Sequence, residues 1–93
     1  MRINEMPVVS FDDIECHFDT CSTDYNFTEC AENDSYIFFS LDEDALDARQ
    51  EELDYYRTVQ NEDRARKYAN DIELQKYLNS RGYDDAVLIY ICW

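Results

Sequence analysis

Basic residues are nearly absent from the first half of the chain. The 46 residues from Ile3 to Ala48 contain thirteen aspartates and glutamates but no lysine or arginine, and His17 is the only histidine of the protein. Up to and including Asp54 there are sixteen acids and two bases, whereas the remainder has six of each. The formal net charge of −14 is therefore carried entirely by residues 1–54.

Glycine, proline and long apolar runs are also scarce. Glycine and proline occur once each, as Gly82 and Pro7, so a glycine-rich phosphate-binding loop is excluded. No apolar run is long enough to cross a bilayer, and Met1 is followed by polar sequence without a signal-peptide pattern. We expect a cytoplasmic protein that does not associate with membranes, and in that compartment its four cysteines would be reduced thiols.

Few residue combinations favour metal binding or catalysis. Cys16, His17, Cys21 and Cys30 include the ligand types of zinc, but their spacing lacks the close pairs of common structural sites. The acidic residues 42–44 could bind Ca²⁺, but the segment has neither the glycine at the turn nor the acidic spacing of an EF-hand calcium loop. The single histidine has no matched nucleophile or second base, and no base accompanies the clustered carboxylates as in a nuclease. We therefore predict that the protein is not an enzyme and has no metal or cofactor.

The acidic half is nevertheless expected to fold. Aromatic residues make up 15% of the chain and hydrophobic residues 45%, whereas disordered acidic tails are poor in both. A length of 93 residues allows one domain, spanning residues 1–93, with a modest core. Repulsion among the carboxylates lowers the stability of such a domain, which indicates that the charge serves a purpose such as binding a basic partner.

The N-terminal forty residues predict one short helix and two strands. Residues 1–9 are expected to form an extended lead-in or an edge strand. Residues 10–13 resemble a capping box, and apolar residues recur at helical spacing through residues 11–21, which favours a short helix. A strand stays open as the alternative, because Ile14, Cys16 and Phe18 alternate with polar residues. Residues 25–30 and 36–40 are rich in strand-forming types and are predicted to pair as an antiparallel hairpin.

The remainder of the chain predicts two helices and a strand. A Ser-x-x-Glu capping box at residues 40–43 predicts a helix beginning at Leu41. No proline or glycine interrupts residues 41–81, so one long helix is possible, but we favour a break near Gln60 with Asn61 capping a second helix. Gly82 is placed to end that helix. The apolar residues 86–93 predict a strand buried on both faces, either central or at the interface of a homodimer. The predicted fold is α+β, a small antiparallel sheet packed with two to three helices in the order α-β-β-α-α-β.

The helix predicted from Leu41 separates charged and apolar residues. At about 100° per residue, its acids at positions 43, 44, 47, 51 and 54 fall within roughly 100° of one another, opposite the apolar positions 41, 45, 46, 53 and 56. These charges recur every ~4 Å along the axis, close to the ~3.4 Å phosphate repeat of a DNA strand. The like-charge pairs Glu43/Asp47 and Asp47/Glu51 each destabilise a helix by ~0.2–0.5 kcal/mol. A solvated face is the ordinary explanation of a charge run, but the next helix mixes both signs, which favours a binding surface here.

In size, charge and this helix, the chain resembles the small acidic inhibitors of phages that imitate DNA, which include anti-restriction proteins such as Arn and Ocr and several anti-CRISPR proteins. The resemblance implies a protein that binds the basic DNA-binding groove of a host restriction or CRISPR nuclease and does not bind nucleic acid itself. The alternative is a general acidic interaction module, antitoxin-like or chaperone-like, for a basic protein. Tyr55 and Tyr56 are candidate contact residues. The predicted partner-binding acids are Asp42, Glu43, Asp44, Asp47, Glu51, Glu52 and Asp54, together with Asp12, Asp13, Glu15 and Asp19.

Overall fold

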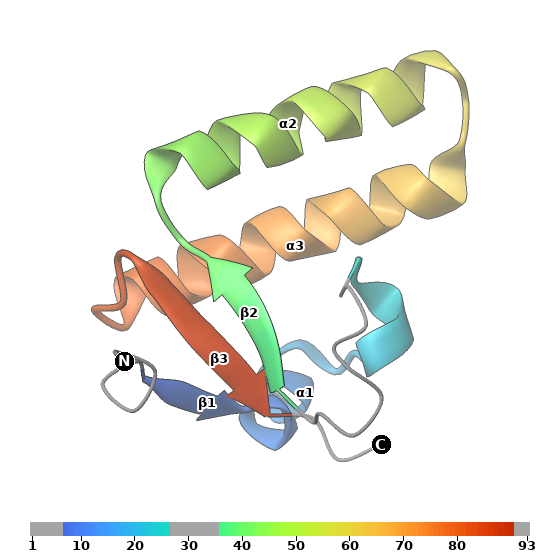
Figure 1. Ribbon diagram of the computed structural model, residues 1–93. Coiled ribbons are helices and arrows are strands. Elements are labelled where there is room, and N and C mark those ends of the chain that lie inside the picture. The colour runs from blue at the N-terminus through green and yellow to red at the C-terminus, as the bar shows by residue number, and fades with distance from the viewer. Residues whose placement is uncertain (1–6, 27–35, 91–93) are drawn as a thin grey trace.

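The computed structural model describes residues 7–26 and 36–90 and shows a small α+β domain, as predicted. Figure 1 shows the elements in chain order. They are β1 (Val8–Ser10), α1 (Phe11–Phe18), the 3-10 turn η2 (Ser22–Asp24), β2 (Tyr36–Ser40), α2 (Glu43–Thr58), α3 (Glu62–Ser80) and β3 (Ala86–Tyr90).

The sheet has the strand order β1-β3-β2, which confirms the prediction of a central C-terminal strand. Strand β2 pairs with β3 in the antiparallel direction, whereas β1 pairs with β3 in the parallel direction, so the sheet is mixed rather than wholly antiparallel. Almost the whole chain separates β1 from β3, and no short turn fixes their relative direction. Of the strand predicted at residues 25–30, Tyr25 and Asn26 lie outside any strand, and residues 27–30 lie outside the described residues.

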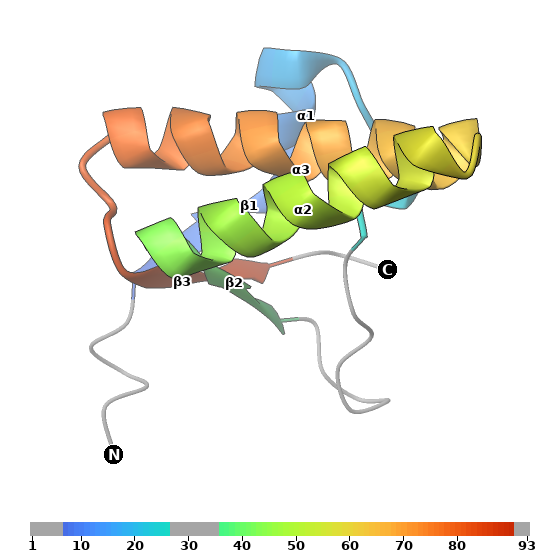
Figure 2. The same cartoon turned by 90° about the horizontal axis from the view of Figure 1, so that it is seen from above.

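All three α-helices lie on one side of the sheet (Figure 2). Residues that alternate along the strands, including Ile37, Phe39, Val87 and Ile89, point to the helices and are buried. The core is completed by Phe11, Ile14, Tyr25, Leu41, Leu74 and Leu78. Within residues 86–90, the prediction that this strand is buried on both faces is wrong: the described helices pack on one face, and on the other face Leu88 is half-buried and Tyr90 is exposed. Residues 91–93 of the predicted strand lie outside the described residues.

The helix boundaries follow local signals in most places. Ser10 caps α1 by accepting a hydrogen bond from the backbone N–H of Asp12 at 3.2 Å, so residues 11–18 form the helix and not the alternative strand. The predicted break is confirmed at Gln60, which has a φ of 61°, and the Asn61 side chain caps α3. Gly82 follows α3 with a φ of 99°, a conformation that favours glycine.

The start of α2 differs from the prediction. The helix begins at Glu43 rather than Leu41, and its cap is Asp42, whose side chain accepts a hydrogen bond from the backbone N–H of Ala45 at 2.9 Å. Ser40 still belongs to β2 and pairs with Ala86, while Leu41 is buried and donates its N–H to Asp85 at 2.8 Å. Because Ser40 is paired in the sheet and Leu41 is buried in the core, the helix begins two residues later than the capping box at residues 40–43 predicts.

Candidate functional site

Helix α2 lies along α3 at the margin of the helical layer (Figures 1 and 2). None of its sixteen residues is buried. Its half-buried residues form the inner side of the helix and are Ala45, Leu46, Arg49, Leu53 and Tyr56. The remaining side of α2 is exposed along its whole length, about 24 Å at ~1.5 Å per residue.

The exposed side presents a row of five carboxylates, here called the α2 acidic row: Glu43, Asp44, Asp47, Glu51 and Asp54. The ion pairs within the described part of the chain are Arg66–Asp24, Arg66–Asp63 and Lys67–Asp63, and none of them includes this row. Glu52 is exposed as well, but it lies about 80° around the helix from the nearest of the five. The row therefore presents its charge to solvent without neutralisation by these residues.

Arg49, the one base in the first fourteen residues of α2, points away from the acidic row. Its guanidinium donates a 2.7 Å hydrogen bond to the carbonyl oxygen of Ser40, donates another to Gln75, and lies 4.1 Å from the ring centre of Phe39. Burial lowers the pKa of Arg49, and the charge of Asp71 opposes this shift. Arg49 is thus used to attach α2 to the sheet and α3, whereas Arg57, one turn beyond Asp54, is exposed and forms no ion pair with the row.

Two amides of α3 fix the position where α2 begins. Buried Gln75 donates from Nε2 to the carbonyl oxygen of Asp42 at 2.9 Å while its Oε1 accepts from Arg49. Asn79 donates from Nδ2 to the carbonyl oxygens of Leu41 and Tyr83, at 3.2 and 2.8 Å. The acidic row is therefore held on a helix whose N-terminus is tied to the core by side-chain hydrogen bonds.

Replacing Gln75 with methionine, which is of similar size, should lower the free energy of unfolding by ~1–3 kcal/mol. The variant removes the side-chain donor to the carbonyl of Asp42 and one of the two acceptors of the Arg49 guanidinium, which keeps its bond to Ser40. Urea unfolding measures the change. Lys76→Met, at the next and exposed position, is the control and should stay within ~0.5 kcal/mol of the wild type. Equal stability of the two variants would contradict the role of Gln75.

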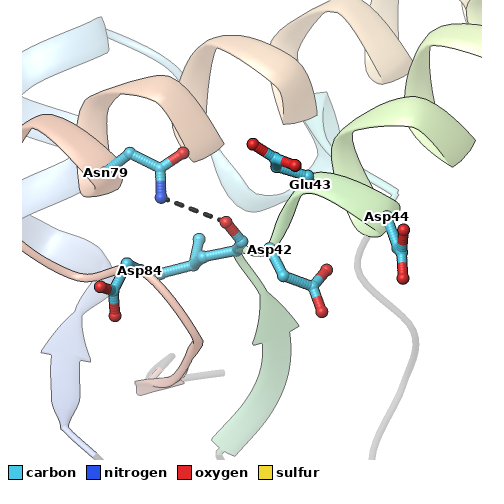
Figure 3. A pocket seen from close by; sticks show the side chains of 6 residues that line it. Asp42, Glu43, Asp44, Asn79 and Asp84 are labelled. Atoms are coloured by element: carbon cyan, nitrogen blue, oxygen red, sulfur yellow. Dashed lines mark hydrogen bonds between the residues drawn. The ribbon is translucent and has the colours of Figure 1, made fainter.

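A hollow of about 550 Å³ continues the acidic surface beyond the helix N-terminus. It is lined by Leu41, Asp42, Glu43, Asp44, Asn79 and Asp84 (Figure 3). Asp84 was missed by the sequence analysis, because only the pairing of Ser40 with Ala86, which are distant in sequence, brings it beside the start of α2. The four carboxylates do not converge on one point (Figure 3), and the described residues contain no group of three or more potential ligands arranged to hold a metal ion.

The acids predicted on the first helix form a separate surface. Asp12, Asp13, Glu15 and Asp19 are exposed, but α3 lies between α1 and α2 (Figure 2). Helix α1 packs against the far side of α3, where His17 stacks on Tyr77 with ring centres 4.2 Å apart. The structure therefore divides the predicted partner-binding residues into two groups, and only the α2 group forms a continuous row.

A further acid is hidden between α3 and the sheet. Asp71 is 4% exposed and accepts hydrogen bonds from the backbone and side-chain amides of Asn26, at 3.2 and 3.3 Å. Burial raises the pKa of this carboxyl to about 6, although the bonds from Asn26 and the charge of Arg49 oppose the shift. Asp71 and Arg49 both line a cavity of about 190 Å³. This carboxyl is part of the interior and does not contribute to the acidic surface.

Comparison with protein families, curated proteins and solved structures gives no significant match. In residues 7–26 and 36–90, no helix combines the length and apolar character needed to cross a membrane.

Proposed function

We propose that this protein is a DNA mimic, acting in the cytoplasm of a phage-infected bacterium, that inhibits a DNA-binding defence enzyme of the restriction or CRISPR type. The observation that carries the proposal is the α2 acidic row. Its five carboxylates are exposed, share one face of one helix and have no cationic neighbour within salt-bridge distance in the described residues. A spacing of ~4 Å per charge along the axis is close to that of phosphates along a DNA strand.

Inhibition would follow from occupation of the DNA site. The groove of a DNA-binding enzyme presents lysine and arginine side chains to phosphates, and a row of carboxylates satisfies the same donors and the same field. Asp42 and Asp84 extend the negative surface past the helix end (Figure 3). Binding would be fast at low salt and weakened by added salt, because the interaction is between exposed charges. The same charge would keep the protein off DNA.

The alternative, a general acidic interaction module for a basic protein, is favoured by one observation. Tyr55 lies on the exposed side of α2, is 56% exposed, and is held edge-to-face against Tyr56 with ring centres 5.0 Å apart. Val59, one turn further, is 50% exposed. An aromatic side chain of this kind adds contact area in a protein interface and does not depend on the partner binding DNA. Tyr56 itself is half-buried and stacks on Tyr68.

Affinity capture from a bacterial lysate tests the proposal and separates it from the alternative. The immobilised protein should retain a DNA-binding enzyme at ~50 mM salt and release it at ~500 mM, because this change shortens the screening length severalfold. Immobilised Glu43→Lys/Asp47→Lys/Glu51→Lys protein serves as the control bait. A retained partner that has no nucleic-acid site would refute DNA mimicry and support the interaction module.

A further inference from the structure

The face of the sheet opposite the helices is apolar and exposed. The strand register places Val8, Leu88 and Phe38 in one row across all three strands, and Tyr90 and Tyr36 side by side in the next row. Of the six large hydrophobic residues that are exposed in the described chain, four belong to this face: Val8 (55%), Tyr36 (41%), Phe38 (59%) and Tyr90 (40%). Apolar side chains are therefore gathered on this one surface.

The described residues of this face carry no charge, which is unusual in this protein. Its described residues are Val8, Ser10, Tyr36, Phe38, Ser40, Ala86, Leu88 and Tyr90, none of which is charged at neutral pH. Charged residues make up 32% of the sequence, and the acids of α1 and α2 belong to the helical layer on the other side of the sheet (Figure 2). It is thus the surface on which two copies of a chain with net charge −14 can approach with the least repulsion.

We propose that this face is the interface of a homodimer, in which two copies pack sheet against sheet around a twofold axis. The four exposed side chains contribute on the order of 400 Å² per copy, taking 150–250 Å² for a whole aromatic side chain. With Leu88 and the small residues around it, the two copies together would bury about 1,000 Å², which is below the ~1,200–2,000 Å² of stable interfaces and corresponds to a weak, reversible dimer. The proposal does not depend on DNA mimicry.

A second copy fits this face better than other occupants do. A twofold axis that passes between the two sheets at Leu88, parallel to β3, would place Phe38 of one copy against Val8 of the other, so that a large side chain meets a small one at both ends of the row. An anionic membrane or a nucleic acid would be repelled by the net charge. Both edges of β3 are paired within the sheet, so the contact uses the face of this strand and not its edge.

Sedimentation equilibrium of the full chain tests the proposal. The wild type should show a concentration-dependent dimer with a dissociation constant in the micromolar range, and added salt should strengthen it because repulsion between the copies is screened. Phe38→Lys and Val8→Lys should each raise the dissociation constant at least ~10-fold, because each places a charge in an apolar contact between the copies. Salt has the opposite effect on a complex formed through the acidic row.

Val59→Lys is the matched control for Val8→Lys. Both positions are valines of similar exposure, 50% and 55%, but Val59 lies at the end of α2 and not on the sheet. The dimer dissociation constant of the Val59→Lys variant should stay within ~2-fold of the wild-type value. Circular dichroism verifies that each variant is folded. A wild type that stays monomeric up to ~200 µM, well above a micromolar dissociation constant, or equal effects of the two valine variants, would overturn the proposal.

Discussion

Changing Glu43, Asp47 and Glu51 to lysine is expected to abolish binding to the target enzyme without unfolding the protein. The three side chains are exposed and form no ion pair with other described residues, so their replacement leaves the core intact. The pairs 43/47 and 47/51 remain like-charged after the change, so the balance of repulsion between these positions within the helix is kept. The variant should lose at least ~100-fold in affinity, because three attractions become repulsions and a like charge facing a basic groove costs several kcal/mol.

The control is a triple reversal with the same change in net charge but outside all the predicted partner-binding acids, at Glu62, Glu73 and Asp85. These acids are exposed on α3 and in the turn before β3. The control should lower affinity by less than ~10-fold, through the long-range field alone, and salt should reduce that difference. Equal losses in both variants would show that the total charge, and not its placement on α2, determines binding.

Replacing Asp71 with asparagine is expected to stabilise the protein at neutral pH and to change how its stability depends on pH. Burial raises the pKa of Asp71 from 3.8 to about 6 in the folded state. Between these two values the folded chain holds a proton that the unfolded chain has lost. The free energy of unfolding contributed by this group therefore falls as pH rises from about 4 to about 6, by on the order of 3 kcal/mol, and remains lower above that range.

Urea unfolding of both proteins at several pH values measures this effect. The asparagine variant should equal the wild type near pH 4 and exceed it by ~1–3 kcal/mol at pH 7, since Asn26 can still donate its backbone N–H to residue 71. Glu73→Gln, at an exposed position of the same helix, should show a constant difference from the wild type over this range. A constant difference for Asp71→Asn as well would contradict a raised pKa.

Local chemistry predicted much of the fold. Ser10 and Asn61 cap their helices with their own side chains, and the break at Gln60 and the stop at Gly82 occur where left-handed backbone is found. The apolar composition of residues 86–90 correctly indicated the central strand. The caps, the break and the stop depend on contacts between residues that are close in sequence, and the strand was indicated by its apolar composition. Both kinds of signal can be recognised in the sequence.

Long-range contacts decided the remainder. The capping signal at Ser40 was overridden because Leu41 enters the core and pairs with Asp85, which is distant in sequence. The inward direction of Arg49 depends on Gln75, and the burial of Asp71 depends on Asn26. The acids of α1 could not be separated from those of α2 before the position of α3 between them was known (Figure 2).

Competition with duplex DNA for the captured enzyme is the most direct measurement of DNA mimicry. A labelled duplex is bound to the enzyme at ~50 mM salt and increasing amounts of this protein are added, so that displacement is followed as a loss of bound label. We predict complete displacement at one protein chain, or one dimer, per DNA site, and none by the Glu43→Lys/Asp47→Lys/Glu51→Lys variant. Simultaneous binding of DNA and protein to the enzyme would contradict the proposal that the α2 acidic row occupies the DNA groove.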